Sequence, residues 1–153
     1  TAKGAESRDP TPLRLGQGEL VLVVDDEPAI CETTRRSLEH RGYRVLDAPT
    51  GIAALAQFSS HPSPIRVVIP DFMMPLMDGV TLCRALRVLA PDVPVIVSSG
   101  GLFGKAGREA QRAFEELGVR QLLHKPHTAE VLLRAVGEAL DEIPRTADGP
   151  SAL

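Results

Sequence analysis

Three nearly continuous runs of apolar, mostly β-branched residues limit the fold of this chain more than any other feature. The runs are Leu20–Val24, Ile65–Ile69 and Val93–Val97. An apolar run that does not alternate with polar residues is typical of a strand buried on both faces of a parallel sheet. Tyr43–Leu46 and Val119–Leu123 are weaker candidates for two further strands. The pattern therefore predicts five strands.

Helical patterns fill the intervals between these strands. They predict helices at 28–41, 52–58, 80–89 and 105–117, and a fifth helix after Thr128. Pro28 suits a first helical turn, Gly42 suits the left-handed end of a helix, and Thr128 can cap a helix N-terminus. Five strands that alternate with five helices form a doubly wound α/β domain, with a parallel sheet and helices on both faces.

The chain has 153 residues, which is enough for one domain with a substantial core. The segments at both ends lack the alternating pattern. We therefore expect a flexible linker at 1–19, one domain at 20–142 and a flexible tail at 143–153. The sequence does not begin with Met, which suggests a piece of a longer protein.

The composition narrows the class of protein. The net charge of -3 argues against a nucleic-acid-binding surface, which is usually basic. The sequence has no apolar run of about 18 residues and no signal-peptide layout at its start. Cys31 and Cys83 are far apart and are expected to be reduced thiols. We expect a cytoplasmic protein without a membrane span in this fragment.

Polar groups with related chemistry follow four of the predicted strands. They are Asp25-Asp26-Glu27, Asp71, Ser98-Ser99-Gly100 and His124-Lys125-Pro126. The carboxyl ends of parallel strands meet at one edge of a sheet, where such folds bind ligands. Neighbouring carboxylates repel one another unless a cation shares them, and oxygen ligands suit Mg²⁺. A lysine and a hydroxyl can pair with phosphoryl oxygens, and a carboxylate can be the nucleophile. The combination predicts a phosphoryl-transfer site that uses Mg²⁺.

Each of these groups has an ordinary structural interpretation when it is taken alone. Acidic residues often cap helices, and Ser-Ser-Gly and Lys-Pro are common in turns. His124 and His127 have no third metal ligand nearby in the sequence, so they do not predict a metal site. The functional prediction therefore depends on four groups at one sheet edge.

The sequence resembles the receiver domain of bacterial two-component response regulators. The resemblance rests on Val23-Val24-Asp25-Asp26-Glu27, Asp71-Phe72-Met73-Met74-Pro75-Leu76-Met77-Asp78-Gly79, Ser99-Gly100 and Lys125-Pro126, in that order, and it covers about residues 19–142. It implies a (βα)5 receiver fold with a five-stranded parallel sheet in the order 2-1-3-4-5. It also implies a phosphorelay function, in which a histidine kinase or a histidine phosphotransfer domain supplies the phosphoryl group.

The resemblance also implies a role for each matching residue. Asp71 matches the phosphoacceptor, Ser99 the switch hydroxyl and Lys125 the cation that pairs with the phosphoryl group. Mg²⁺ would be held by Asp26, by Asp71, by Asp25 through water and by the backbone carbonyl of Met73. A receiver of this kind is not an enzyme on other substrates; it catalyses only its own phosphorylation and dephosphorylation. We expect the glycine-rich stretch Gly100–Gly107 to be the mobile loop that phosphorylation orders.

The segment before the first strand suggests a narrower relationship. Gly16-Gln17-Gly18-Glu19 resembles the junction that follows the ATP-binding domain in hybrid sensor histidine kinases, and Ser98-Ser99-Gly100 is similar to that subgroup. We therefore expect this chain to be the C-terminal receiver of a hybrid kinase.

Three residues depart from the family pattern. Pro70 comes directly before Asp71 and removes one hydrogen-bond donor from a central strand. Leu122 stands where the family usually has Tyr or Phe, so the usual aromatic readout is in question. Arg66 replaces a frequent acidic residue, which we interpret as surface variation. Pro70 and Leu122 leave open an alternative, a pseudo-receiver that binds proteins without being phosphorylated.

Enzymes on a similar sheet are the other alternative. A Walker-type nucleotide site would need Gly at position 99 and Ser or Thr at 106, where Ser99 and Ala106 stand. No Gly-x-Gly-x-x-Gly follows the first strand, which argues against a dinucleotide site. Asp25-Asp26-Glu27 also lacks the Asp-x-Asp spacing of haloacid-dehalogenase-type phosphatases.

Overall fold

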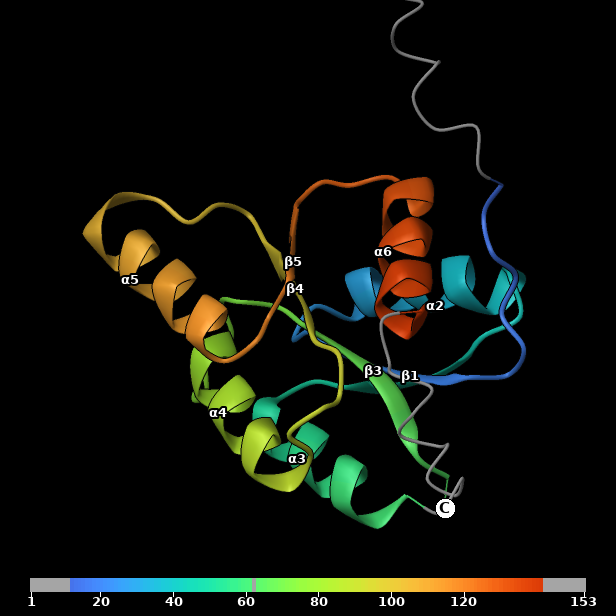
Figure 1. Cartoon of the computed structure of the whole chain (residues 1–153), viewed down its shortest axis with the longest axis horizontal. Coiled ribbons are helices and arrows are strands. Elements are labelled where there is room, and N and C mark those ends of the chain that lie inside the picture. The colour runs from blue at the N-terminus through green and yellow to red at the C-terminus, as the bar shows by residue number, and fades with distance from the viewer. Residues whose placement is uncertain (1–11, 62, 142–153) are drawn as a thin grey trace, which may run out of the picture.

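The structure is a computed structural model and describes residues 12–61 and 63–141. Strands and helices alternate along the chain, as predicted (Figure 1). The strands are β1 (Leu20–Val24), β2 (Arg44–Ala48), β3 (Ile65–Pro70), β4 (Ile96–Ser99) and β5 (Gln121–His124). The helices are α2 (Pro28–His40), α3 (Gly51–Ser60), α4 (Gly79–Leu89), α5 (Gly104–Glu116) and α6 (Ala129–Asp141). Within these residues, no helix is both long enough and apolar enough to cross a membrane.

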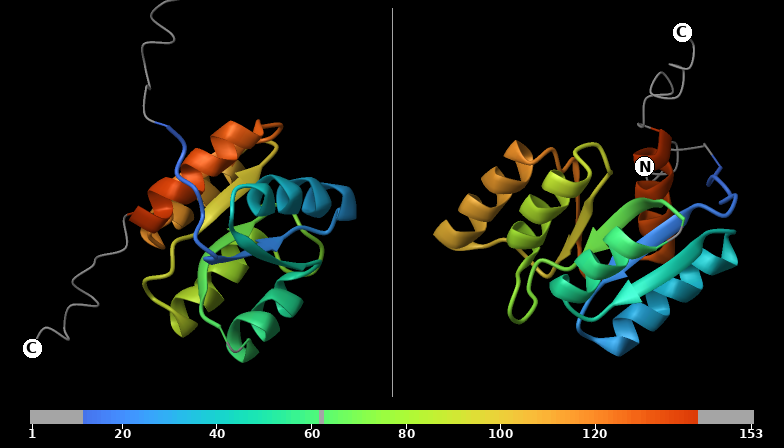
Figure 2. Two further views of the ribbon diagram at one scale, coloured as in Figure 1. Left: turned by 90° about the vertical axis from the view of Figure 1, so that its right-hand side faces the viewer. Right: turned by 90° about the horizontal axis from the view of Figure 1, so that it is seen from below.

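Helices lie on both sides of the strands (Figure 2), and each side has its own hydrophobic core. In β1, Leu20, Leu22 and Val24 contribute to the core under α3, α4 and α5. Val21 and Val23 contribute to the other core, under α2 and α6. This alternation follows from the period of two along a strand. The continuous apolar run at 20–24 is thus explained by burial on both sides.

The sheet differs from the prediction in one respect. The predicted order 2-1-3-4-5 is present, but the strands form a three-stranded sheet β2-β1-β3 and a two-stranded sheet β4-β5. Two isolated parallel bridges, Val68 with Val95 and Asp71 with Ser98, connect them. The interruption lies at Pro70, which has no N–H to donate to β4. A single continuous five-stranded sheet was therefore wrong.

The last residues of the expected linker contact the domain. The N–H groups of Gly16 and Gly18 donate to the carbonyls of Arg41 (2.6 Å) and Gly42 (2.9 Å). Arg14 forms ion pairs with Glu19 at the start of β1 (2.9 Å) and with Asp141 at the end of α6 (2.6 Å). We call residues 13–19 the strap. Residues 1–11 and 142–153, which hold the rest of the linker and the tail, lie outside the described residues, and the domain limits stay predictions.

The glycine-rich stretch after β4 is shorter as a loop than expected. The loop ends at Phe103, because α5 begins at Gly104. Gly107 lies inside that helix and is buried. A Cβ atom there would lie 2.3 Å from the backbone carbon of Leu102, so glycine permits the loop to pack closely on the helix.

Candidate functional site

Three aspartates meet where β1 and β3 end. Asp25 follows β1 and is 4% exposed, and Asp71 follows β3 and is 7% exposed. Asp26 is exposed beside them, and oxygens of the three carboxylates lie within 4.8 Å of one another. The backbone places Asp71 firmly, because its N–H donates to the Val24 carbonyl at 2.9 Å. The predicted acidic cluster is therefore formed.

Lys125 follows β5 and neutralises part of this charge. Its Nζ atom lies 3.1 Å from Asp25 Oδ2 and 3.3 Å from Asp71 Oδ1. The N–H of Lys125 donates to the Ser99 carbonyl at 2.8 Å, which fixes the start of the loop. Two carboxylates from different strands thus share one ammonium group, as the strand-end pattern predicted.

The pKa values of the site reflect burial and this shared charge. Burial raises the pKa of Asp71 above its ordinary value, and the charge of Asp25 raises it further, whereas Lys125 lowers it. Burial alone would lower the pKa of Lys125, but its hydrogen bonds and ion pairs with Asp25 and Asp71 raise it above its ordinary value. The cluster holds more negative charge than one lysine balances, so it favours a further cation.

The spacing of the carboxylates fits such a cation. Mg²⁺ binds oxygen at about 2.0–2.1 Å in an octahedron, so two of its ligand atoms lie at most about 4.2 Å apart. The observed limit of 4.8 Å is close to that value, and all three residues offer oxygen. The donor set and its spacing therefore fit a hard divalent cation such as Mg²⁺.

The loop after Asp71 is shaped by the remaining residues of the motif. Asp78 caps α4 by accepting from the Thr81 N–H at 2.9 Å. A Cβ atom on Gly79 would lie 3.0 Å from the Phe72 backbone, so glycine allows a close approach there. Leu76 has a positive φ of 69°, and the Met77 N–H donates to the Pro75 carbonyl at 2.7 Å. This tight turn leaves the Met73 and Leu76 side chains exposed.

The two serines at the end of β4 have different partners. Ser99 Oγ accepts from the Gly101 N–H at 2.9 Å, so the predicted switch hydroxyl is held by its own loop. Ser98 Oγ lies 3.5 Å from His127 Nε2. Burial lowers the pKa of His127, and so does the charge of Lys125. No role was predicted for His127, because its partner Ser98 is distant in the chain.

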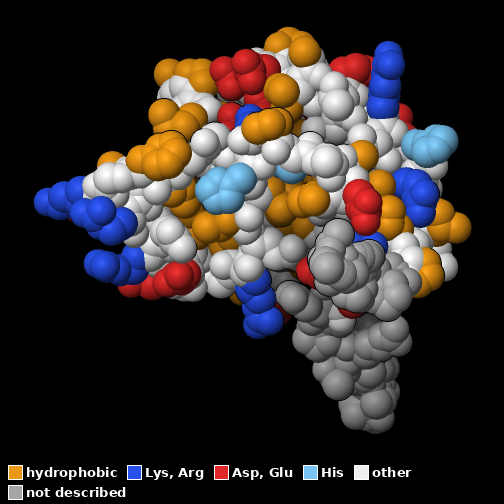
Figure 3. Space-filling model, turned by 90° about the horizontal axis from the view of Figure 1, so that it is seen from above, with side chains coloured by type: hydrophobic (Ala, Val, Ile, Leu, Met, Phe, Trp, Pro, Cys, Tyr) orange, Lys and Arg blue, Asp and Glu red, His pale blue; other side chains and the backbone are white. Residues whose placement is uncertain are grey.

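Leu122 and Arg66 are two of the residues that depart from the family pattern, and the structure shows where each one lies. Leu122 is half-buried in β5, in place of the expected ring, and packs against the core under α3, α4 and α5. Arg66 is exposed, in agreement with surface variation. On the face seen in Figure 3, hydrophobic, acidic and basic side chains lie next to one another. That face therefore has no large patch of a single charge.

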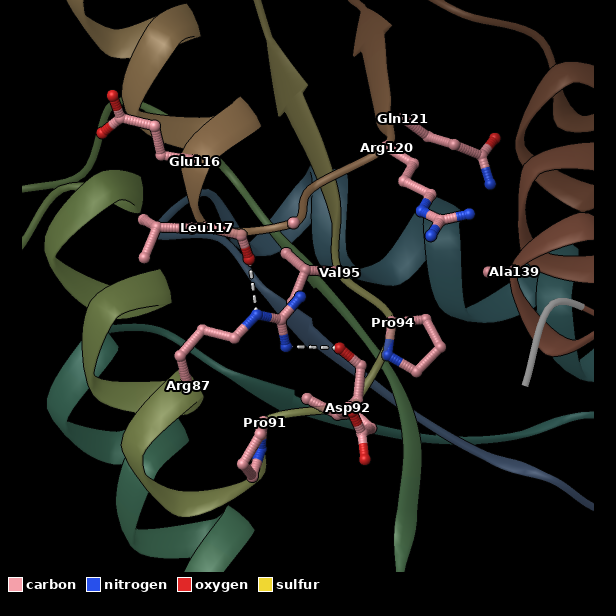
Figure 4. A pocket seen from close by; sticks show the side chains of 12 residues that line it. Arg87, Pro91, Asp92, Pro94, Val95, Glu116, Leu117, Arg120, Gln121 and Ala139 are labelled. Atoms are coloured by element: carbon pink, nitrogen blue, oxygen red, sulfur yellow. Dashed lines mark hydrogen bonds between the residues drawn. The ribbon is translucent and has the colours of Figure 1, made fainter. Parts of the chain in front are cut away.

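A separate cavity of about 550 Å³ contains none of these site residues. It is lined by Arg87, Arg120 and the segments that lead into β4 and β5 (Figure 4). Arg87 fills a structural role there. Its guanidinium donates to the carbonyls of Leu117 and Val93, both at 2.6 Å, and thereby joins α4 to the end of α5. The cavity lies at the start of these strands, away from the acidic cluster.

Comparison with known proteins identifies the family. The family model of the response regulator receiver domain matches residues 21–137, so the chain belongs to that family. It is 38% identical over 113 residues to the response regulator MprA of Mycobacterium sp. (strain KMS), which covers 74% of this chain and 46% of that protein. The chain therefore spans about half the length of the curated relatives that it matches.

Solved structures support the same fold. The response regulator receiver domain protein from Clostridium thermocellum is 29% identical, with a TM-score of 0.72, and the match covers 80% of this chain and 94% of that one. A CheY-like receiver domain protein from Methanospirillum hungatei JF-1 is 28% identical, with a TM-score of 0.73, covering 82% and 95%. The expected receiver fold is thereby confirmed.

Proposed function

We propose that this domain accepts a phosphoryl group on Asp71 from a phosphohistidine and changes conformation in response. The donor would be a histidine kinase or a histidine phosphotransfer domain, in a two-component phosphorelay. One observation carries the proposal: Asp71 is buried at a strand end with two further carboxylates and the Lys125 ammonium group around it. This set provides a nucleophile and the charges that phosphoryl transfer requires.

In the transfer step, an Asp71 carboxylate oxygen forms a bond to phosphorus. The P–N bond of the phosphohistidine breaks, and its electron pair returns to the imidazole nitrogen. Mg²⁺ bound at the site would neutralise charge on the transferred oxygens. Asp26 and Asp71 would bind it directly, Asp25 through water, and Met73 through its backbone carbonyl. Lys125 would pair with the phosphoryl group. The Ser99 hydroxyl would give up its hydrogen bond with the Gly101 N–H and donate to the phosphoryl group instead.

The proposal assigns no other substrate to the domain. We infer that its chemistry is limited to its own phosphorylation and dephosphorylation. The resemblance of the segment before β1 also supports a position at the C-terminus of a hybrid histidine kinase in the cytoplasm. The pseudo-receiver alternative differs in one respect that can be measured, because it predicts no phosphorylation.

Phosphorylation by a small donor tests the proposal. The protein is incubated with phosphoramidate or acetyl phosphate and Mg²⁺, and its intact mass is measured over time. The wild type is expected to gain one phosphoryl group, and omission of Mg²⁺ is expected to slow the gain strongly. Asp92→Asn, an exposed acidic residue remote from the site, serves as the control and should behave as the wild type. No gain with Mg²⁺ present would favour the pseudo-receiver.

A further inference from the structure

The hydrogen bonds between β3 and β4 define a regular register with one gap. The Val68 N–H donates to the Pro94 carbonyl (3.1 Å), and the Phe72 N–H donates to the Ser98 carbonyl (2.8 Å). From the first bond to the second, the donor advances from residue 68 to 72 and the acceptor from 94 to 98. The intermediate donor would therefore be residue 70, and its acceptor the carbonyl of Ile96. Residue 70 is Pro, which has no N–H. We call this row of bonds the seam.

The direction of the backbone groups supports this assignment. The Asp71 N–H donates to Val24 of β1, on the side away from β4. Successive residues of a strand direct their N–H groups to opposite sides, so position 70 faces β4. The carbonyl of Ile96 therefore has no donor from β3, although Ile96 is fully buried. Any residue other than proline would supply the missing donor.

The seam divides the candidate site. Asp25, Asp26 and Asp71 belong to the half that contains β1 and β3, whereas Ser99 and Lys125 belong to the half that contains β4 and β5. At the site, the halves are joined by the parallel bridge between Asp71 and Ser98, which includes the Phe72–Ser98 hydrogen bond, and by the ion pairs of Lys125. A shift along the seam would therefore change the distance between Ser99 and any group attached to Asp71.

We propose that Pro70 is a positioning residue for this site. By removing the middle hydrogen bond of the seam, it lets the β4–β5 half adjust against the carboxylates, so that Ser99 and Lys125 can close on a phosphoryl group. A buried carbonyl without its donor is unfavourable, so its presence in a native fold requires an explanation, such as a functional role. The movement would carry β5, including Leu122, and would report phosphorylation without the usual ring. This inference rests on the proposed role of Asp71.

The first test examines the seam without phosphorylation. Pro70→Ala restores an N–H opposite Ile96, while Pro64→Ala, just before β3, removes a proline outside the seam. Amide hydrogen exchange is compared at Phe72 and Ser98. We expect Pro70→Ala to slow exchange there about three- to tenfold, the range that one hydrogen bond gives. Pro64→Ala should leave it unchanged. Equal exchange in Pro70→Ala and wild type would overturn the proposal.

The second test examines the site. Beryllofluoride with Mg²⁺ serves as the phosphoryl mimic, and dephosphorylation of Asp71 is followed by intact mass. We expect the mimic to change exchange in β4 and β5 less in Pro70→Ala than in wild type, and the dephosphorylation rate to differ several-fold. Pro64→Ala should match the wild type in both. The positioning role would be overturned if Pro70→Ala slows exchange at the seam but leaves both the response of β4 and β5 to beryllofluoride and the dephosphorylation rate unchanged. If the wild type takes neither mimic nor phosphoryl group, the proposed function fails, whatever the exchange at the seam shows.

Discussion

The two halves of the sheet differ in the composition and the hydrogen bonding of their strands. In the β2-β1-β3 half, β1 is apolar at every position and each of its residues pairs with both neighbours, with one register shift against β3 between Leu20 and Val21. In the β4-β5 half, Ser98 and Ser99 occupy buried strand positions and the bonds to β3 are interrupted. The carboxylates stand on the first half, and the residues expected to move stand on the second. The proposed acceptor and the residues proposed to respond to it therefore lie on different halves.

Lys125 links the two halves through ion pairs with two carboxylates, and its loss should have the largest effect. Lys125→Ala removes the ammonium group from both Asp25 and Asp71. We expect phosphorylation by phosphoramidate to slow about a hundredfold, as for other groups that stabilise developing charge. Lys105→Ala, which removes an exposed lysine from α5, is the control. A change of less than about twofold for Lys125→Ala would exclude this role.

Two glycines allow the connections that lead into the two halves to be compared. Gly42 precedes β2 and Gly118 precedes β5, and both have positive φ. A Cβ atom at Gly42 would lie 2.4 Å from the Gly16 carbonyl of the strap, whereas at Gly118 the nearest atom is 3.8 Å away. Both alanine variants have the left-handed strain, but only Gly42→Ala also displaces the strap. We expect a loss of about 2–3 kcal/mol in unfolding free energy for Gly42→Ala and a smaller loss of about 1 kcal/mol for Gly118→Ala.

Urea unfolding measures both values. Equal losses would mean that the strap does not stabilise the β2-β1-β3 half.

Asp71 should make the stability of its half depend on pH. Its raised pKa means that the folded state binds the proton more tightly than the unfolded state. This contribution is fully present below the ordinary aspartate pKa of about 3.9 and is lost as pH rises through the raised value. Without Mg²⁺, the wild type should therefore lose stability relative to Asp71→Asn as pH rises from about 4. Parallel curves in urea unfolding would show that the burial of Asp71 has no energetic consequence.

Ser98 and Ser99 test the responding half with the smallest expected effect. Ser99→Ala removes the hydroxyl that would donate to the phosphoryl group, while Ser98→Ala removes its buried neighbour next to His127. We expect Ser99→Ala to change the rates of phosphorylation and dephosphorylation a few-fold and to weaken the response of residues 100–103 to beryllofluoride. Ser98→Ala should have little effect on either. A larger effect of Ser98→Ala than of Ser99→Ala would show that Ser99 is not the switch hydroxyl.

The sequence predicted the first half better than the second. Apolar runs report burial, and β1 is both buried and paired, so its prediction was confirmed. The run Val93–Val97 is also buried except at Pro94, but the strand is Ile96–Ser99. The strand begins shortly after Pro94. It ends in the polar residues Ser98 and Ser99, which a search for apolar runs does not detect. Burial and hydrogen bonding are different properties, and only burial is visible in the pattern.

The candidate site was largely predictable because strand ends converge in a parallel sheet. The cluster of Asp25, Asp26 and Asp71 with Lys125 follows from that topology alone. The strap and the Ser98–His127 contact were not predictable, since each depends on residues far apart in the chain. Pro70 was recognised as an irregularity, but the loss of its bond to Ile96 required the register of β3 and β4.

Localisation of the phosphoryl group is the most direct test of the central claim. After treatment with phosphoramidate and Mg²⁺, trypsin should release residues 67–84, which contain the two aspartates Asp71 and Asp78. Tandem mass spectrometry is expected to place the phosphoryl group on Asp71, with no modification of this peptide in Asp71→Asn. A phosphoryl group on another residue, or an unchanged yield in Asp71→Asn, would contradict the account.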